Sequence, residues 1–153
     1  MFNYVNSIDV TLPNNTLVTA GSGTYHIGDA LKIASGKYAL ATGDVAVEAI
    51  CLEDKTLSAD GDLHVMMVTD GMLFEVPIQA YSSSYTKVGS RVTIHTDSAQ
   101  VTATLSTVLY GSGASASWGS AAALGGSTGA YIVDTQGASA AGDKVIVRLN
   151  YFR

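Results

Sequence analysis

A glycine followed by aspartate or serine, and then directly by an apolar stretch, recurs along this chain. The five pairs are Gly28-Asp29, Gly43-Asp44, Gly61-Asp62, Gly89-Ser90 and Gly142-Asp143. Glycine adopts positive φ without steric cost, and the short polar side chain after it can hydrogen-bond the local backbone, so each pair predicts a turn. The spacing of the pairs is uneven, which favours one irregular all-β domain over a solenoid or a propeller.

Between these turns the apolar residues alternate with a period of two, which is typical of strands with one buried face. Every second residue of the segment 72–78 is large and apolar, and the segments 91–95, 101–109 and 145–151 alternate in the same way. Because proline has no amide hydrogen, the strand that contains Pro77 should lie at the edge of a sheet or end there.

No stretch has a convincing helical period. Residues 114–124 are rich in alanine, but Gly119 and several serines oppose a helix there. The sequence therefore predicts an all-β sandwich or barrel with at most one short helix.

Composition excludes several classes of protein. The 153 residues suit one domain, and 13 acidic against 8 basic residues give a net charge of −5, which disfavours a nucleic-acid partner. No apolar run is long enough to span a bilayer, so no membrane partner is expected. The start of the sequence lacks the pattern of a signal peptide, and the single Cys51 cannot form an internal disulfide. We expect a protein made in a reducing cytoplasm.

The chain divides by composition into an N-terminal segment, residues 1–26, and a single β domain, residues 27–153. The first segment carries one charge and three aromatic side chains, and it is either an extended arm or the first hairpin of the core. Residues 111–130 consist almost wholly of glycine, alanine and serine around Trp118 and Leu124. Such a stretch is either a flexible loop or a surface that packs closely on something else.

Catalytic motifs are weak. The segment 125–129 matches the nucleophile elbow of serine hydrolases, but no strand pattern leads into it and no histidine follows Ser127. Glu53 and Asp54 are neighbours in an apparent strand, so their carboxylates should point to opposite faces. Cys51 lies in an apolar run and should behave as a small hydrophobic residue.

Metal-binding motifs are weak as well. His26, His64 and His95 each lack a second ligand at metal spacing. Asp60 and Asp62 lack the rest of a calcium loop and should form a solvated turn. The sequence therefore predicts a protein that is not an enzyme and that uses no metal or cofactor.

The runs 26–41 and 47–55 resemble the capsid decoration proteins of tailed bacteriophages, also called cement or head-stabilising proteins. In that family a Gly-Asp turn, an apolar strand, a Gly-Lys turn, a second strand and an apolar run that ends in Glu-Asp recur, and residues 140–149 are similar to it too. These runs make up 35 of the 153 residues. The resemblance implies a small β-barrel or β-tulip-like domain that binds the major capsid protein on the outside of the virion and stabilises the capsid, often as a homotrimer.

The resemblance also implies where such a protein makes contact, because a cement protein needs a rigid body and extended segments that bridge its neighbours. The segment before Ile27 is the expected capsid contact, with the aromatic side chains as anchors. The candidate capsid contacts are Phe2, Tyr4, Val5 and Ile8, and the candidate oligomer or outer-surface contacts are Trp118 and Leu124.

Two alternatives from other classes stay open. A carbohydrate- or receptor-binding β module of a virion fibre or tail would stack exposed aromatic rings on sugars, and Trp118, Tyr81, Tyr85 and Tyr110 are the residues to test. A β-barrel enzyme could gather its catalytic groups from several protomers, and a perturbed carboxylate or histidine in a pocket would mark it.

Overall fold

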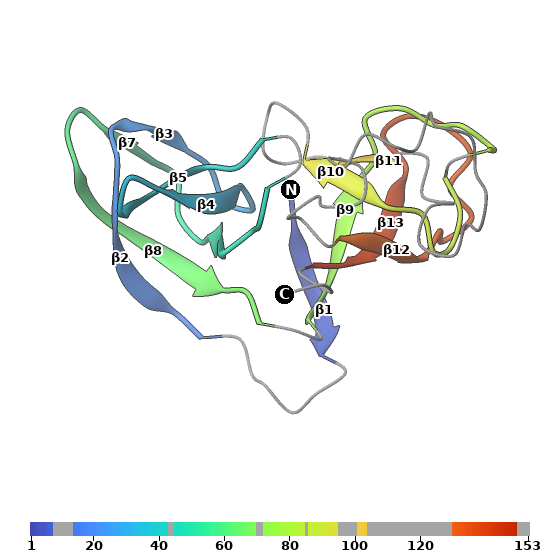
Figure 1. Cartoon of the computed structure of the whole chain (residues 1–153), viewed down its shortest axis with the longest axis horizontal. Coiled ribbons are helices and arrows are strands. Elements are labelled where there is room, and N and C mark those ends of the chain that lie inside the picture. The colour runs from blue at the N-terminus through green and yellow to red at the C-terminus, as the bar shows by residue number, and fades with distance from the viewer. Residues whose placement is uncertain are drawn as a thin grey trace.

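The computed structural model describes residues 1–7, 14–42, 45–69, 72–84, 86–94, 101–103 and 130–149. These residues form strands and no helix, so the all-β prediction is confirmed (Figure 1). No helix among the described residues is long and apolar enough to cross a membrane. The segment 114–124, the candidate for at most one short helix, lies outside the described residues.

Five strands close a small barrel, in the order β2-β5-β4-β6-β8. They are β2 (Thr16–Ala20), β4 (Ala30–Ala34), β5 (Lys37–Leu40), β6 (Ala49–Cys51) and β8 (Gly61–Met67). The short strands β3 (Gly23–Tyr25) and β7 (Lys55–Leu57) pair antiparallel as a ribbon. The barrel alternative of the predicted fold class is therefore the one adopted.

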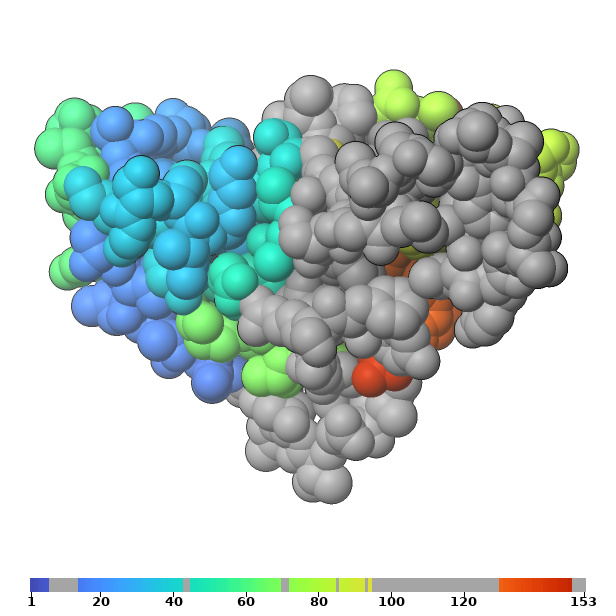
Figure 2. Space-filling view, viewed as in Figure 1, coloured from blue at the N-terminus to red at the C-terminus, as the bar shows by residue number. Residues whose placement is uncertain are grey.

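A four-stranded antiparallel sheet in the order β1-β9-β13-β12 lies beside the barrel (Figure 1). Its strands are β1 (Asn3–Ser7), β9 (Met72–Pro77), β12 (Tyr131–Asp134) and β13 (Lys144–Arg148). In the space-filling view, the barrel residues, coloured blue to green, gather on the left side of the molecule (Figure 2). Two further strands, β10 (Val92–Ile94) and β11 (Val101–Ala103), pair antiparallel. The barrel strands lie between β1 and β9 in the sequence, so the barrel is an insertion between two neighbouring strands of the sheet.

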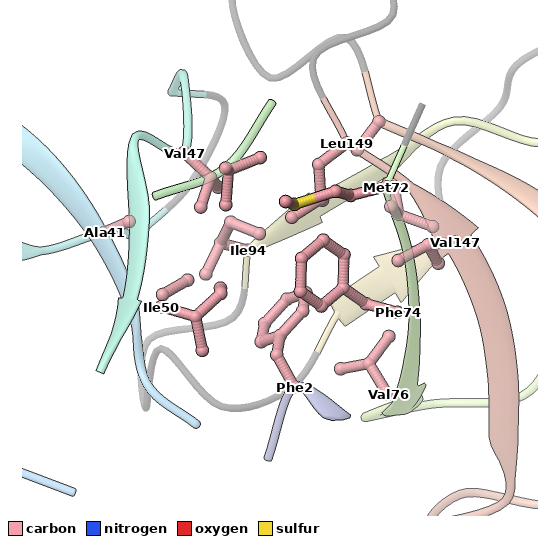
Figure 3. Packing of buried hydrophobic residues seen from close by; sticks show 14 of the residues in the cluster. Phe2, Ala41, Val47, Ile50, Met72, Phe74, Val76, Ile94, Val147 and Leu149 are labelled. Carbon is pink, nitrogen blue, oxygen red and sulfur yellow. The ribbon is translucent and has the colours of Figure 1, made fainter. Parts of the chain in front are cut away.

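The molecule has two hydrophobic cores, one inside the barrel and one between the barrel and the sheet. The barrel interior holds Ala20, Tyr25, Leu31, Ala49, Cys51, Leu63 and Val65. In the second core, the barrel residues Ala41, Val47 and Ile50 face Phe74 and Val147 of the sheet (Figure 3). The barrel wall is therefore buried on both faces where it meets the sheet.

The predicted faces of the sheet strands are confirmed. In β9, Met72, Phe74 and Val76 are buried, and in β13 so are Val145 and Val147. β9 ends at Pro77, as its missing amide hydrogen requires, although the strand lies inside the sheet and not at its edge. Its pairing with β1 stops at Asn3, opposite Glu75, before the proline is reached.

Three of the predicted glycine turns have the expected backbone. Gly28, Gly89 and Gly142 have φ of 83°, 84° and 89°. The prediction for Gly61 is wrong, because this residue is already the first of β8 and pairs with Ala20. A Cβ at this position would lie 3.0 Å from Cδ2 of Leu57, so a larger residue would require only a small shift of that side chain. Gly43 lies outside the described residues.

The first 26 residues contribute to both parts of the molecule. β1 pairs with β9 in the sheet, whereas β2 pairs with β8 in the barrel, so these two strands do not form a hairpin with each other. The two structural units therefore do not separate at residue 26.

Candidate functional site

Two of the four predicted N-terminal contact residues pack into the core. Phe2 is 3% exposed, and its ring lies edge to face with Phe74 at a centroid distance of 6.2 Å. Its backbone N–H donates to the carbonyl of Gly28 at 2.9 Å, which ties the start of the chain to the barrel. Tyr4 packs on the same Phe74 ring at 6.1 Å. The ring of Phe2 is a core side chain, and this corrects the prediction that it is a surface anchor.

Of the other predicted contact residues, only Val5 belongs to the described part of the chain. Val5 is 46% exposed at a register shift of β1, so its contact with a partner stays a prediction. Ile8, Trp118 and Leu124 lie outside the described residues, as does the whole segment 111–129. The aromatic set proposed for sugar stacking is likewise represented only by Tyr81, which is 38% exposed.

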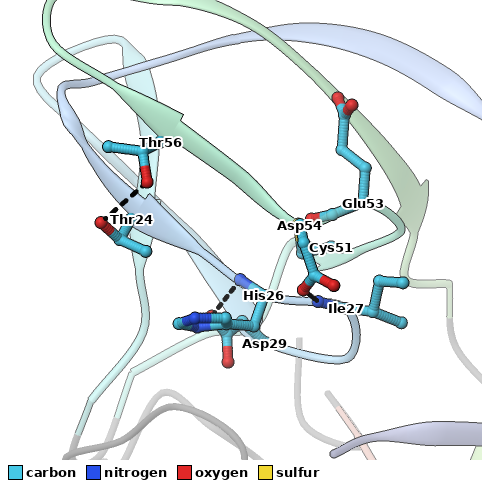
Figure 4. A network of polar contacts seen from close by, with 8 residues as sticks. All are labelled: Thr24, His26, Ile27, Asp29, Cys51, Glu53, Asp54 and Thr56. Atoms are coloured by element: carbon cyan, nitrogen blue, oxygen red, sulfur yellow. Dashed lines mark hydrogen bonds and ion pairs between the residues drawn. The ribbon is translucent and has the colours of Figure 1, made fainter.

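Asp29 stabilises the turn that leads into β4. Its Oδ2 accepts a hydrogen bond from the backbone N–H of His26 at 2.8 Å, and the imidazole Nδ1 of His26 lies 3.7 Å from the same oxygen (Figure 4). The carboxylate is almost fully buried, and a buried carboxylate is tolerated because it is hydrogen-bonded. This carboxylate therefore holds backbone in place.

Glu53 and Asp54 lie in the turn after β6 and not in a strand, which corrects the predicted element. Glu53 Oε1 accepts from the backbone N–H of His64 at 2.8 Å and lies 3.6 Å from Lys55 Nζ. The hydrogen bond from His64, helped by Lys55, holds the pKa of Glu53 below its ordinary value. Asp54 Oδ1 accepts from the N–H of Ile27 at 3.0 Å. The two carboxylates bind different segments and point away from each other (Figure 4), so they do not converge as a catalytic pair.

Cys51 faces the interior of the barrel and is fully buried. Its Sγ donates to the carbonyl of Glu53 at 3.0 Å. Burial is the main cause that raises the pKa of the thiol, so the reactive thiolate is disfavoured. Its predicted behaviour as a small hydrophobic residue is confirmed.

The described part of the chain holds no group of three histidine, cysteine, aspartate or glutamate side chains that could bind a metal ion. Asp60 pairs with Lys37, whereas Asp62 is exposed on β8. His26 and His64 lie on the surface, and His95 lies outside the described residues.

A shallow hollow lies between the two turns that precede β13. Gln136, Ala138, Asp143 and Lys144 line it, together with two glycines. Asp143 Oδ2 accepts from the N–H groups of Ser139 at 2.7 Å and Ala140 at 2.9 Å, which lowers the pKa of its carboxyl group. Lys144 Nζ donates to Glu75 at 2.6 Å. The charged groups of this hollow thus bind the chain itself.

An exposed row of mostly apolar side chains crosses the outer wall of the barrel. Leu17 of β2 pairs with His64 of β8, and the N–H of Leu52 donates to the His64 carbonyl at 2.9 Å on the other side. The Met1 side chain lies next along, over the Cα of Gly28. Leu17 is 55% exposed, Met1 48% and Leu52 37%, and His64 is exposed as well. We call these four residues, Leu17, His64, Leu52 and Met1, the barrel row.

The barrel row continues a buried surface of the same wall. A second row runs parallel to the barrel row, two residues further along each strand. It consists of Met66, Ile50 and Ala30, and the sheet covers it. The sheet therefore covers one row of the outer wall and leaves the next row open to solvent. Nothing in the pattern of one strand could have shown this, because the row joins residues far apart in the sequence.

Comparison of the chain with protein-family models, curated proteins and solved structures finds no match in any of the three. The function therefore has to be argued from the residues and their geometry.

Proposed function

We propose that this chain is a structural protein of a virus particle, which binds the outer surface of a tailed-bacteriophage capsid and stabilises it. The barrel row is the observation that carries the proposal, because it presents apolar side chains on a wall that two cores hold rigid. The partner is the major capsid protein, and the place of action is the surface of the virion.

The residues that resemble decoration proteins support the proposal by where they fall in the fold. Residues 26–41 form the Asp29 turn, β4 and β5, and residues 47–55 form β6 and the turn after it. Residues 140–149 form the last turn and β13. The resemblance thus covers three of the five barrel strands and one strand of the sheet.

The state of the titratable groups also favours binding over catalysis. Glu53, Asp54 and Asp143 each accept hydrogen bonds from backbone N–H groups, and Asp29 does the same inside a turn. Carboxylates engaged in this way stabilise loops and are not poised to transfer protons. We assign no catalytic step to this chain.

Binding through the barrel row gains from copy number. Covering one large apolar side chain contributes about 1.5–3 kcal/mol, so the row gives only a modest affinity for a single copy. Copies joined as a homotrimer, which we also propose, would bind far more tightly, because the second and third contacts become intramolecular.

Quantitative mass spectrometry of purified virus particles from the source lysate tests the proposal. A ratio near one copy per shell subunit supports a decoration role. A few copies per particle would assign the chain instead to a fibre or tail tip, as a receptor- or carbohydrate-binding module. Absence from the particle would reject the virion proposal.

Variants of the barrel row test the surface itself. Leu17→Asp and Leu52→Asp should each lower capsid binding at least about tenfold, because a charge replaces a side chain that the interface covers. Val88→Asp is the matched control, because it adds the same charge at an apolar side chain that is 65% exposed but belongs to a segment outside the barrel row. An equal loss in all three variants would show that charge, and not the row, controls binding.

A further inference from the structure

The barrel closes between β2 and β5 through a single parallel bridge. Ala20 pairs with Tyr38, and the N–H of Gly21 donates to the Tyr38 carbonyl at 2.9 Å. On its other edge, β2 pairs with β8 along its whole length. In the parallel register Lys37, the first residue of β5, lies beside Thr19, so the segment 16–18 extends beyond the start of β5. One edge of this segment has no strand partner in the described part of the chain.

The backbone of Leu17 points to that open edge. In an antiparallel pair, the N–H and C=O groups of successive residues point alternately to the two sides of the strand. The Gly21 N–H points toward β5, and Leu17 has the same parity. The groups of Thr16 and Val18 therefore bind β8, whereas Leu17 offers one donor and one acceptor to a strand that would lie beside it.

Apolar side chains flank the open edge on both faces of the wall. Leu17 points outward and is 55% exposed. Ile33 is on the same face of β4 as the fully buried Leu31, yet it is 54% exposed, so the barrel interior opens at this end. Val18 and Tyr38, which pack against the interior core, are only half-buried. Because side chains of a strand alternate between its two faces, the apolar side chains of an added strand would cover Val18 and Ile33 on the interior face, while its backbone would lie beside Leu17.

The edge also lacks the features that usually prevent strand addition. Exposed edges of natural sheets carry charges, prolines or bulges. The sequence of β2, Thr-Leu-Val-Thr-Ala, has no charge and no proline, and its register with β8 is regular. Among the described residues, this edge therefore has neither a strand that covers it nor a charge or proline of its own that would block pairing.

Charge selects the occupant. The described barrel residues, 14–42 and 45–69, include six acidic side chains and three lysines. Like charges disfavour a second copy of the same barrel at this edge, and they favour a basic segment.

We propose that the open edge of β2 is a strand-addition site for a partner protein. The occupant is an extended basic segment with alternating apolar side chains. Its backbone hydrogen-bonds to Leu17, and its apolar side chains cover Val18 and Ile33. This proposal rests on the backbone of β2 and does not depend on the capsid as partner.

Synthetic peptides test the proposal on the full chain. The probe is a blocked hexapeptide of alternating valine and lysine, used beside two forms that are N-methylated at every valine or at every lysine. The unmethylated peptide should bind and slow amide exchange of Leu17 by at least about tenfold, because that N–H becomes hydrogen-bonded. Only one of the two methylated peptides should still bind, since each lacks the N–H groups of one edge. Equal binding of all three peptides, or unchanged exchange at Leu17, would overturn the proposal.

A variant pair isolates the backbone contribution. Leu17→Pro removes the N–H on the open edge and leaves the pairing with β8, whereas Leu17→Ala shortens the side chain and keeps the N–H. Peptide binding should be at least tenfold weaker in Leu17→Pro than in Leu17→Ala. Equal binding by the two would refute strand addition. If Leu17→Pro does not fold, the methylated peptides decide alone.

A second copy as the occupant has its own signature. Sedimentation measures whether the unmodified chain forms a dimer. A dimer that is lost in Leu17→Pro but kept in Leu17→Ala would show that a second copy pairs with this edge, and it would overturn the proposed occupant. A monomer that binds the peptide supports it.

Discussion

Truncation of Phe2 to alanine should destabilise the molecule by about 3–5 kcal/mol. The ring is 3% exposed between β9 and the barrel wall, where Phe74 and Ile50 lie next to it (Figure 3). Burial of a phenylalanine side chain contributes about 1.5–3 kcal/mol, and the edge-to-face contact with Phe74 adds about 0.5–1.5 kcal/mol. The cavity left in a core that joins two rigid units raises the loss to the stated range.

Urea unfolding followed by circular dichroism measures this loss directly. The same change should lower Tm by roughly 6–20 °C in a chain of this size. Val5→Ala is the control, because Val5 is 46% exposed on β1, the strand that directly follows Phe2, and its truncation should change stability by at most about 0.5 kcal/mol. If Phe2→Ala were as stable as Val5→Ala, the ring would not belong to the core, and the interpretation of Phe2 as a partner anchor would return.

Three further predictions concern single groups. Gly28→Ala should destabilise the chain by about 1–3 kcal/mol more than Gly89→Ala in thermal unfolding, because both glycines have positive φ but only Gly28 has the Met1 side chain over it. Asp143→Asn should flatten the pH dependence of Tm below about pH 4. The lowered pKa of Asp143 gives stability that is present above the unfolded value and is lost as pH falls through the folded value. Cys51 should react with an aromatic disulfide at least about tenfold more slowly in the native chain than in urea, because the thiol is buried and its pKa is raised.

Alternation in the sequence predicts the sheet strands well, because one face of β9 and one face of β13 meet the core. It does not predict the two-core arrangement. In β8, Val65 points into the barrel and Met66 into the second core, so both faces of that strand are buried. The unbroken apolar run Val65-Met66-Met67-Val68 indicates that both faces of β8 are buried, since strands buried on both faces lose the alternation of apolar and polar residues. Which layer each face meets depends on pairing between distant strands.

The barrel row is hidden from sequence reasoning for a similar reason. Leu17, Leu52 and His64 come from separate segments, and a single exposed leucine is ordinary on a protein surface. The aromatic residues near the start of the sequence suggest instead that Phe2 contacts a partner. A large hydrophobic side chain suits a core as well as an interface, so its type alone does not distinguish the two. The continuous apolar run before Glu53 and Asp54 predicts a strand, but the chain turns here, and both carboxylates accept hydrogen bonds from backbone N–H groups.

The insertion of the barrel between β1 and β9 imposes an order on folding during synthesis. The barrel strands occupy one continuous stretch of chain, so the barrel can close soon after β8 has left the ribosome. β13, which pairs with the other edge of β9, is complete at Arg148, 71 residues after Pro77, or about 4–14 s later at 5–20 residues per second. During that interval β1 and β9 form a two-stranded ribbon against a finished barrel. We therefore expect the late arrival of β13, whose Val147 pairs with Phe74 of β9, to make completion of the sheet the slow, long-range step of folding.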